Sequence, residues 1–373
     1  MALRALARVN LAAIERNCVR LRRELRGGEA LCAVVKADGY GHGAAQAAQA
    51  ALAGGASWLG VAGAGEAVEL RAAGIDAPLL VMGAISPEEL ELAVGAGADV
   101  VAWREAFVAR LEATGVRMGV HVKLDTGMGR LGTRDLEEAM AVVESVLAAR
   151  RLDVAGVMTH FATADELCDT FFDEQVERFR PFAAYARSLG AGALAHAANS
   201  AGTLRSGDAH FDMVRCGIAI YGMDPFGEDP AARGLEPALE LASHVADVKA
   251  VAPGQSAGYG RRFVAEKDTC VAVLPIGYGD GVRRALTNDA DVLIRGRRWP
   301  LVGTVSMDNV TVDVGPAPDV QPGDRAMLIG QDGGERILAE EWARRLGTIN
   351  YEITCGLTAR VPRMYHRDGE PAA

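Results

Sequence analysis

The sequence predicts an α/β protein, with an N-terminal closed (β/α)8 barrel of the TIM type followed by a smaller, mostly-β domain. Over residues 11–238, short apolar runs alternate with longer amphipathic segments, which is typical of parallel strands joined by helices. After residue 238 the helical periodicity nearly disappears, and short β-like runs are separated by Gly, Pro and Asp. An open doubly wound sheet is the alternative for the first domain.

Eight apolar runs are candidate barrel strands, and helix-like segments separate most of them. One such segment, SPEELELAVGAG, has Ser86 as a candidate N-cap, Pro87 at the first helical position and acidic residues in its first turn. A second one is TRDLEEAMAVVESVLAARR. The strand runs are LCAVV at 31, WLGVA at 58, PLLVM at 78, ADVVAW at 98, GVHVKL at 119, VAGVM at 154, GALAH at 192 and DMVRCGIAIYG at 212.

The predicted β-domain covers residues 239–373. Its strands are expected in the runs ASHVADVKAV, DTCVAVLPIGYG, DVLIRGRRWPLVGTV and VTVDVG, each bounded by turn-forming residues. One amphipathic segment, LAEEWARRLG, predicts a late helix.

Composition argues against several classes of function. The chain has 39 Lys and Arg against 49 Asp and Glu, a net charge of -10, which argues against a nucleic-acid partner. The start, MALRALARVN, lacks the apolar core of a signal peptide, and the uncharged residues 43–65 read as a helix ending in a loop rather than a membrane span. The six cysteines form no C-x-x-C pair and the seven histidines no H-x-H or H-x-x-x-H pair. We therefore expect a reduced, cytoplasmic protein without a dedicated metal site.

Lys36 is the first candidate functional residue, because it ends an apolar run and precedes the glycine-rich segment ADGYGHG. An isolated lysine at such a point commonly marks only the end of a strand. In a barrel, however, the C-terminal ends of the strands face the active site. A partly desolvated lysine there is a neutral amine that can form a Schiff base. Tyr40 in the same segment could reach an oxygen atom of a ligand.

Other polar residues follow the ends of predicted strands. Lys123 and Arg130 lie in KLDTGMGRLG, where an arginine held in a tight loop suits bidentate recognition of a carboxylate. The segments VMTHFATAD and HAANSAG add His160 and His196 at two successive strand ends. One histidine in such a place is commonly structural, whereas two are better explained by a shared site.

A possible anion site follows the last two predicted strands. Arg215 lies inside an apolar strand, where a buried guanidinium needs an acceptor. Gly217 and Ile218 follow it and offer backbone N–H groups, while Asn199 and Ser200 follow the preceding strand. Barrel enzymes commonly bind phosphate after strands seven and eight.

The chain resembles bacterial alanine racemases from about residue 8 to residue 365. The resemblance is carried, in order and spacing, by AVVKADGYGHG, KLDTGMGRLG, THFATAD, HAANSAG, VRCGIAIYG, LPIGYGDG, VSMDN and TINYEITCGLTARVPR. It implies a barrel enzyme that uses pyridoxal 5'-phosphate (PLP), in which residues 1–10 pair with the β-domain. It also implies a head-to-tail homodimer, whose active sites each join one barrel to the β-domain of the other subunit.

The resemblance also implies roles for individual residues. Lys36 would carry PLP as a Schiff base and serve as the base on one face of the substrate, and Tyr259, supplied by the other subunit, would be the base on the opposite face. Arg215 would face the pyridine nitrogen. Lys123 matches a lysine that is often carbamylated, with a negative charge that orients Arg130. The residues that match cofactor ligands are Lys36, Tyr40, His160, Asn199, Ser200, Arg215, Gly217, Ile218 and Tyr351, and those that match substrate contacts are Arg130, Met307, Asp308 and Tyr278.

The implied function is interconversion of L-alanine and D-alanine, with D-alanine supplied for peptidoglycan. Gly258, Ser306 and Asn309 depart from residues common in the family, so a broader racemase that accepts serine is the alternative. Barrel decarboxylases that use PLP typically place an acidic residue, not an arginine, at the pyridine nitrogen. A PLP carrier without activity would lack the β-domain, and a structural protein leaves the buried Arg215 unexplained.

Overall fold

The computed structural model describes residues 3–190 and 192–372, and the chain divides into two compact units. Residues 14–220 form what we call the barrel unit. The β unit combines the N-terminal residues up to Ala13 with the residues from Tyr221 onward. Compactness alone does not test the domain boundary predicted after residue 238, which stays a prediction.

Within the described residues, eight parallel strands close a barrel, which confirms the predicted fold class over an open sheet. Each of the eight apolar runs contains one strand. Neighbouring strands pair in chain order, and the last strand returns to the first. The strands are β2 (Ala30–Val34), β3 (Trp58–Val61), β4 (Leu79–Val81), β5 (Asp99–Ala102), β6 (Met118–Lys123), β7 (Leu152–Met158), β8 (Leu194–His196) and β9 (Met213–Cys216).

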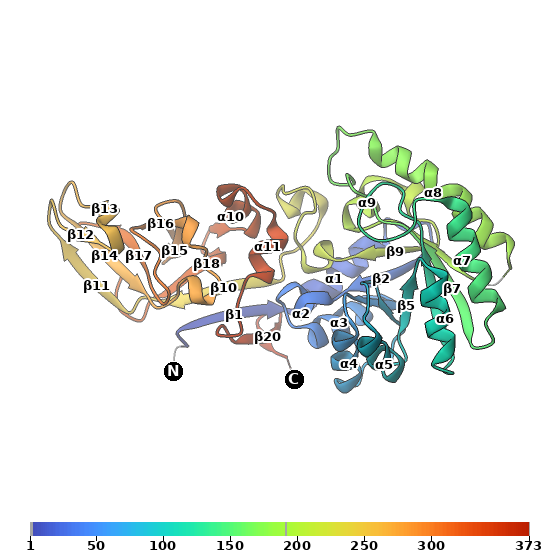
Figure 1. Ribbon diagram of the computed structural model, residues 1–373. Coiled ribbons are helices and arrows are strands. Elements are labelled where there is room, and N and C mark those ends of the chain that lie inside the picture. Colours follow the sequence, from blue (N-terminus) through green and yellow to red (C-terminus); the bar gives the residue numbers. More distant parts are fainter. Residues whose placement is uncertain (1–2, 191, 373) are drawn as a thin grey trace. The chain divides into compact units, whose positions relative to one another are not determined.

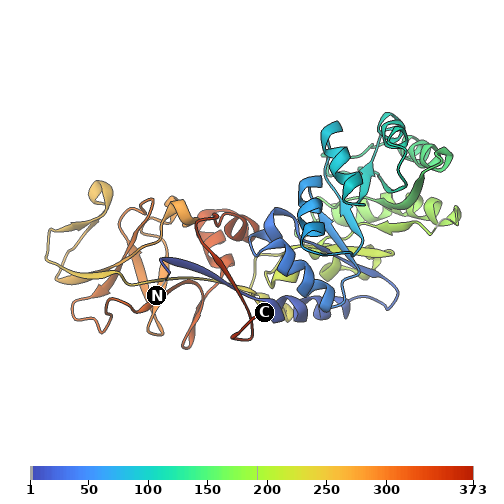
Figure 2. The same ribbon diagram turned by 90° about the horizontal axis from the view of Figure 1, so that it is seen from below.

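Helices of the barrel unit lie outside the ring of strands, as the blue to green ribbons show in both views (Figures 1 and 2). The helix predicted after Ser86 is confirmed, because the Ser86 hydroxyl accepts a hydrogen bond from the Glu89 N–H group at 3.2 Å. None of the helices in the described part of the chain has the length and apolar character needed to cross a bilayer. The helices are α1 (Leu11–Arg22), α3 (Ala44–Ala53), α4 (Ala64–Ala72), α5 (Pro87–Gly95), α6 (Glu105–Ala113), α7 (Leu136–Ala148), α8 (Phe171–Ser188) and α9 (Ser200–Arg205). The segment α2 (Lys36–Tyr40) is a left-handed turn, and η1 (Gly207–Ala209) and η2 (Ile218–Tyr221) are 3-10 turns.

The β unit contains a long mixed sheet and a short hairpin. Its first strand, β1 (Ala5–Asn10), pairs antiparallel with β10 and parallel with β20, so the blue N-terminal strand lies among strands from the other end of the chain (Figure 1). The predicted late helix is α10 (Ala339–Leu346), which buries Trp342.

The remaining strands of the long sheet are β10 (Leu239–His244), β11 (Asp247–Val251), β14 (Thr269–Leu274), β15 (Asp291–Ile294), β16 (Arg297–Val302), β17 (Val310–Gly315), β18 (Arg325–Asp332), β19 (Glu335–Ile337), β20 (Arg363–Arg367) and β21 (Glu370–Pro371). The hairpin consists of β12 (Ser256–Ala257) and β13 (Phe263–Val264). A second helix, α11 (Asn350–Cys355), follows α10, and short 3-10 turns are η3 (Pro230–Arg233), η4 (Tyr259–Arg261), η5 (Tyr278–Asp280) and η6 (Arg284–Leu286).

The interior of the barrel is unusually polar along β6. His121 and Lys123 are two residues apart on this strand, so their side chains share one face, and both are buried. Arg215 of β9 is buried as well. Barrel interiors are normally filled by branched apolar side chains. These polar side chains therefore mark the part of the barrel where a site can be built.

Candidate active site

Lys36 follows β2 and lies half-buried at the C-terminal end of the barrel. The next four residues form a left-handed turn, with φ of 53° at Ala37, 52° at Asp38, 60° at Gly39 and 53° at Tyr40. For residues other than glycine this conformation costs about 1–2 kcal/mol each. Such strain concentrates at functional sites and persists only where the surrounding structure imposes it.

Two carboxylates impose this turn. Glu66 of α4 accepts a hydrogen bond from the N–H group of Ala37 at 2.7 Å and another from Ala62 at 2.7 Å. Asp38 accepts one from the N–H group of Ala44, at the start of α3, at 3.0 Å. These contacts with the starts of α3 and α4 therefore help to hold the turn that follows Lys36.

The guanidinium group of Arg215 is hydrogen-bonded to uncharged groups. Its Nη1 donates to Nδ1 of His196 at 2.8 Å, and its Nη2 donates to the carbonyl oxygens of Thr159 at 2.8 Å and Ala197 at 3.0 Å. Within residues 3–190 and 192–372, no carboxylate pairs with this guanidinium, and its Nε makes no hydrogen bond. Burial lowers the pKa of Arg215 to about 10, which leaves it charged at neutral pH.

His160 lies beside Arg215, with 3.3 Å between Nδ1 and Nη2. The pKa of His160 lies well below its ordinary value, because burial disfavours the charged ring and Arg215 repels a further proton. Lys123, Arg130 and Lys36 lower this pKa in the same sense. Four cationic side chains therefore surround one neutral histidine, which is the electrostatic setting of a site for an anionic ligand.

Lys123 ends β6 and is 4% exposed. Burial lowers the pKa of its amine to about 8, and repulsion by Arg215 and Arg130 acts in the same sense. About a tenth of this amine is neutral at pH 7, far more than for an ordinary lysine with a pKa of about 10.4.

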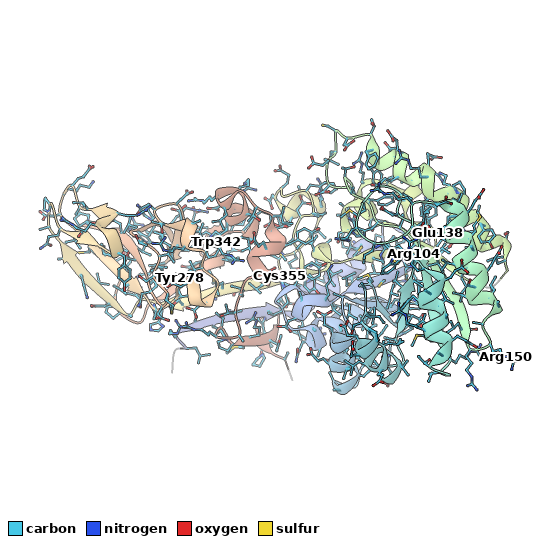
Figure 3. The ribbon with its side chains drawn as sticks, in the orientation of Figure 1. Arg104, Glu138, Arg150, Tyr278, Trp342 and Cys355 are labelled. Carbon is cyan, nitrogen blue, oxygen red and sulfur yellow. The ribbon has the colours of Figure 1, made fainter. Side chains whose placement is uncertain are left out.

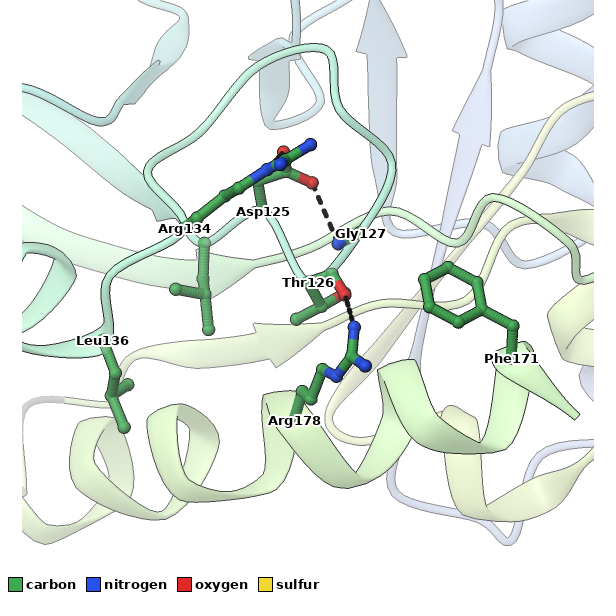
Figure 4. A pocket seen from close by; sticks show the side chains of 8 residues that line it. Asp125, Thr126, Gly127, Arg134, Leu136, Phe171 and Arg178 are labelled. Atoms are coloured by element: carbon green, nitrogen blue, oxygen red, sulfur yellow. Dashed lines mark hydrogen bonds and ion pairs between the residues drawn. The ribbon is translucent and has the colours of Figure 1, made fainter.

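Arg130 is exposed on the loop that follows β6. The carboxylate of Asp125 closes this loop by accepting a hydrogen bond from the N–H group of Gly127 at 3.0 Å (Figure 4) and another from that of Gly129, also at 3.0 Å. Burial raises the pKa of Asp125, but the hydrogen bonds from Gly129 and Gly127 outweigh it and hold this pKa below its ordinary value. The far end of the loop is tied to α7, because Thr133 donates to Glu138, a residue labelled in Figure 3.

A cavity of about 600 Å³ lies against the same loop (Figure 4). Arg178 of α8 reaches into it and donates a hydrogen bond to the carbonyl oxygen of Thr126 at 3.1 Å. None of the residues predicted for the active site lines this cavity, so it is distinct from the candidate site. Its lining residues are Leu124, Asp125, Thr126, Gly127, Arg134, Leu136, Phe171 and Arg178.

The predicted anion-binding residues of the barrel unit come together. The hydroxyl oxygen of Ser200 accepts hydrogen bonds from the N–H groups of Gly217 at 3.0 Å and Ala219 at 3.3 Å. A Cβ atom on Gly217 would lie 2.4 Å from the hydroxyl oxygen of Tyr40, so only glycine fits there. Tyr40 itself is 7% exposed. Tyr40, Ser200 and Gly217 form one small cradle at the C-terminal ends of β2, β8 and β9.

Three other predicted cofactor ligands lie in different settings. The side chain of Asn199 accepts a hydrogen bond from the N–H group of Gly202 at 2.9 Å, so it caps α9. Ile218 is buried at the start of η2. Tyr351 lies on α11 in the β unit. A cofactor contact for each of them stays a prediction.

The predicted residues Tyr259, Tyr278 and Met307 lie on adjoining loops of the β unit. Tyr259 is 73% exposed, and its carbonyl oxygen accepts a hydrogen bond from the Thr304 hydroxyl at 2.6 Å. The N–H group of Tyr278, labelled in Figure 3, donates to the carbonyl oxygen of Ser306 at 2.9 Å. Tyr278 is 41% and Met307 50% exposed. The β unit therefore presents these side chains toward solvent on a hydrogen-bonded backbone.

A buried carboxylate anchors these loops. Asp280 is fully buried and accepts hydrogen bonds from Nη1 of Arg4 and from the N–H group of Gly277, both at 2.9 Å. Arg360 lies 3.3 Å from the same carboxylate and also pairs with Asp308. Asp280 thus ties the loop of Tyr278 to the segment that precedes β1.

Replacing Asp280 with alanine is expected to lower the free energy of unfolding by about 3 kcal/mol, because it leaves the buried N–H group of Gly277 and the half-buried guanidinium group of Arg4 without their acceptor. Urea denaturation followed by circular dichroism measures this loss. Asp319, which pairs with Arg295 but is 58% exposed, provides the matched control, and D319A should change stability by no more than about 0.5 kcal/mol. Equal unfolding midpoints for the two variants would contradict the anchoring role.

The sequence reasoning missed two polar residues inside the barrel. His121 lies 2.8 Å from His196, measured between Nδ1 and Nε2, and its own Nε2 lies 3.3 Å from Oδ2 of Asp99. The signal available was the spacing of His121 and Lys123, since residues two apart on a strand share a face. The partner Asp99 could not be recognised, because it belongs to a different strand.

Comparison with known proteins agrees with this geometry. The family model of the alanine racemase N-terminal domain matches residues 9–225, and that of the C-terminal domain matches residues 238–365. The alanine racemase of Symbiobacterium thermophilum is 43% identical over 366 residues, which cover 96% of each chain. That of Thermobifida fusca is 44% identical over 368 residues, covering 96% of this chain and 97% of the relative.

Solved structures give the same result. The alanine racemase of Streptomyces coelicolor A3(2) superposes with a TM-score of 0.90 at 39% identity over 97% of each chain. The alanine racemase of Bacillus anthracis with bound L-Ala-P superposes with a TM-score of 0.91 at 36% identity, covering 100% of this chain and 97% of the other. The family models match both parts of the sequence, and the solved structures superpose on nearly the whole chain. The chain therefore belongs to the alanine racemase family.

Proposed function

We propose that this protein interconverts L-alanine and D-alanine at a PLP site built on Lys36 and Arg215. The observation that carries the proposal is the cationic group of Arg215, 3.3 Å from His160, and Lys36, at the strand ends where a barrel enzyme acts. Such a group suits an anionic cofactor together with the carboxylate of an amino acid.

The residues of the barrel unit fit PLP. Its phosphate suits the cradle of Tyr40, Ser200 and Gly217, where a larger residue than glycine would collide with Tyr40. Its pyridine nitrogen suits Arg215, whose Nε has no partner in the described part of the chain. Lys36 would attach the cofactor. The other proposed ligands are His160, Asn199, Ile218 and Tyr351.

When bound, PLP supplies the electron sink that weakens the Cα–H bond of an amino acid. Racemisation also needs a proton acceptor on one face of Cα and a proton donor on the other. The Lys36 amine would serve one face and the Tyr259 hydroxyl the other. Arg130 would bind the substrate carboxylate, and the remaining proposed substrate contacts are Met307, Asp308 and Tyr278.

A homodimer would complete this site, with Tyr259 acting in the barrel of the other subunit. Two observations support the proposal. Tyr259 is 73% exposed, although its backbone is held by Thr304. Tyrosine combines an apolar ring with a polar hydroxyl group and is enriched at interfaces between chains. We further propose a cytoplasmic location and a role in supplying D-alanine for peptidoglycan.

Incubating L-alanine with PLP-loaded protein in D2O tests the reaction directly. We expect D-alanine that carries deuterium at Cα, because the proton removed from one face is replaced from solvent on the other. Chiral chromatography with mass spectrometry measures both products. Deuterium that appears only in L-alanine would show that one face works alone, and an absence of exchange would contradict the proposed function.

We also propose that Lys123 is carbamylated. The neutral amine would attack carbon dioxide, forming a nitrogen–carbon bond and releasing one proton. Its pKa of about 8 makes the neutral form accessible, and the negative carbamate would be stabilised by Arg215 and Arg130, which now repel the charged amine. A carbamate there would also orient Arg130 toward the substrate.

Carbamylation should depend on pH, with the group lost as the pH falls below about 8, because acid protonates the Lys123 amine. Adding ¹³C-labelled bicarbonate and recording ¹³C NMR spectra between about pH 6 and pH 9 detects the carbamate carbon. K123M should lack this signal and serves as the control. A signal of equal intensity in K123M, or none at all in the wild type, would refute the modification.

A broader racemase that accepts serine is the second candidate function. Ser306 and Met307 lie next to Tyr278, so changes at these positions bear directly on the size of the proposed pocket. Comparing kcat/KM for L-alanine and L-serine separates the two functions. A ratio near one would favour the broader enzyme, whereas an apolar pocket that fits the methyl group of alanine should disfavour L-serine by about 10²-fold.

A further inference from the structure

A chain of hydrogen bonds crosses the barrel from Arg215 to a carboxylate. Nη1 of Arg215 lies 2.8 Å from Nδ1 of His196, whose Nε2 lies 2.8 Å from Nδ1 of His121. Nε2 of His121 then lies 3.3 Å from Oδ2 of Asp99. Asp99 begins β5, so it lies at the N-terminal end of the barrel, opposite to the end at which Lys36 follows β2.

The chemistry of the end groups fixes the direction of this chain. A guanidinium group only donates hydrogen bonds and a carboxylate only accepts them. A neutral imidazole has one donor and one acceptor nitrogen, so each ring can continue the chain in one orientation only. His196 must carry its proton on Nε2, and so must His121. A second proton on either ring would place two donors face to face.

The surroundings agree with two neutral rings. His121 and His196 are both fully buried. Burial lowers the pKa of His196 well below its ordinary value, and the charge of Arg215 acts in the same sense. The Asp99 side chain, by contrast, is 22% exposed, so solvent can stabilise its negative charge.

Two glycines provide the space for this chain of hydrogen bonds. A Cβ atom on Gly119 of β6 would lie 2.4 Å from both carboxylate oxygens of Asp99. A Cβ atom on Gly156 of β7 would lie 2.5 Å from Nδ1 of His121. Glycine weakens the interior of a strand and often marks a place where another group approaches closely. The glycines at positions 119 and 156 therefore leave room in β6 and β7 for the hydrogen-bonded side chains of Asp99 and His121.

We propose that Asp99 and His121 are positioning residues, which act through His196 to hold the guanidinium group of Arg215 in one orientation. The acceptors of Nη2 include backbone carbonyl oxygens, whereas Nη1 depends on the lone pair of His196. Without Asp99, His121 could reverse its tautomer and donate to His196, which would then turn its own proton toward Arg215. The consequence for catalysis rests on the proposed function, in which Arg215 faces the pyridine nitrogen of PLP.

The tautomers can be measured without cofactor or substrate. Apoprotein labelled with ¹⁵N in its histidine rings should show both His121 and His196 protonated at Nε2 and not at Nδ1. The variants H121F and H196F assign the two sets of signals. In D99A, we expect the Nε2-protonated population of His121 and His196 to fall. A doubly protonated ring, or a ring protonated at Nδ1 in the wild type, would overturn the proposal.

Kinetics of the PLP-loaded enzyme test the consequence. D99N keeps an oxygen that can accept from His121 but removes the charge, whereas D99A removes the acceptor. We expect D99A to lower kcat about tenfold with little change in KM, the loss that corresponds to one unsatisfied buried donor. D99N should recover most of that loss. The absorption band of bound PLP and its dissociation constant should shift in D99A.

Asp153 provides the matched control. It lies near the start of β7, where its carboxylate pairs with Arg117 on the surface, so D153N removes one negative charge from the same end of the barrel. If D99A and D153N agree in kcat, spectrum and PLP affinity, the positioning role is wrong. If the wild type does not racemise alanine, the proposed function fails. The NMR measurement of the histidine tautomers would still test the hydrogen-bond chain, because it needs neither cofactor nor substrate.

Discussion

Replacing Lys36 with alanine is expected to abolish racemisation in both directions, with a loss of at least about 10⁴-fold in kcat/KM. Lys36 is proposed both to attach PLP and to move a proton at Cα, and a positioned general base alone contributes about 10²–10⁴-fold. Initial rates from each enantiomer measure the loss. The control is K267A, which removes an exposed lysine of the β unit and should leave both rates unchanged.

The attachment site can be identified separately, because the chain has four lysines, at positions 36, 123, 249 and 267. Borohydride makes a reversible link to PLP permanent, and peptide mapping then shows which lysine carries the label. We expect the label on Lys36. A label on Lys123 would contradict this assignment, and it is a real alternative because burial lowers the pKa of the Lys123 amine to about 8.

Replacing Tyr259 with phenylalanine is expected to separate the two faces of the reaction. Racemisation should fall by about 10²–10⁴-fold in both directions, because the equilibrium constant between enantiomers is one and both values of kcat/KM must fall together. Exchange of the Cα proton with solvent should behave differently. D-alanine, whose proton faces Lys36 in the proposed site, should keep exchanging, whereas L-alanine should not.

Mass spectrometry of each enantiomer after incubation in D2O measures this asymmetry. Y185F is the matched control, because Tyr185 lies on α8, where its hydroxyl donates to Glu144 away from the proposed site, and its effect should be small and equal for the two enantiomers. Equal exchange of L-alanine and D-alanine by Y259F would remove Tyr259 from the role of second base.

Mixing the two inactive variants tests whether active sites are shared between subunits. A heterodimer of K36A and Y259F would contain one site with both bases intact and one site with neither. After exchange of subunits, about a quarter of the wild-type activity should return. No recovery, with exchange verified by native mass spectrometry, would mean that Lys36 and Tyr259 do not act across a subunit interface.

The barrel could be predicted from the sequence because its strands are short and buried on both faces. Such strands appear as continuous apolar runs, and all eight runs contain a barrel strand. The start of a helix could also be predicted where capping residues mark it, as Ser86 and Pro87 do for α5. The candidate site residues stood out because charged side chains such as Lys36 and Arg215 interrupt or end apolar runs.

Other features depend on residues that are distant in the sequence. The left-handed turn after Lys36 requires the carboxylate of Glu66, and no local pattern predicts that Ala37 and Asp38 adopt positive φ. The parallel pairing of β1 with β20 joins the two ends of the chain. No residue pattern predicts this pairing of distant segments.

The sequence by itself determined the order of elements and the identity of the reactive side chains, because periodicity, capping and residue chemistry are local properties. Only the tertiary structure decided how these side chains shift one another's pKa values and which hydrogen bonds they make. Barrel closure gathers Lys36, Lys123, Arg130 and Arg215 around His160, and burial there disfavours additional charge. The same closure aligns Asp99, His121 and His196, since strand register determines which side chains meet inside a barrel.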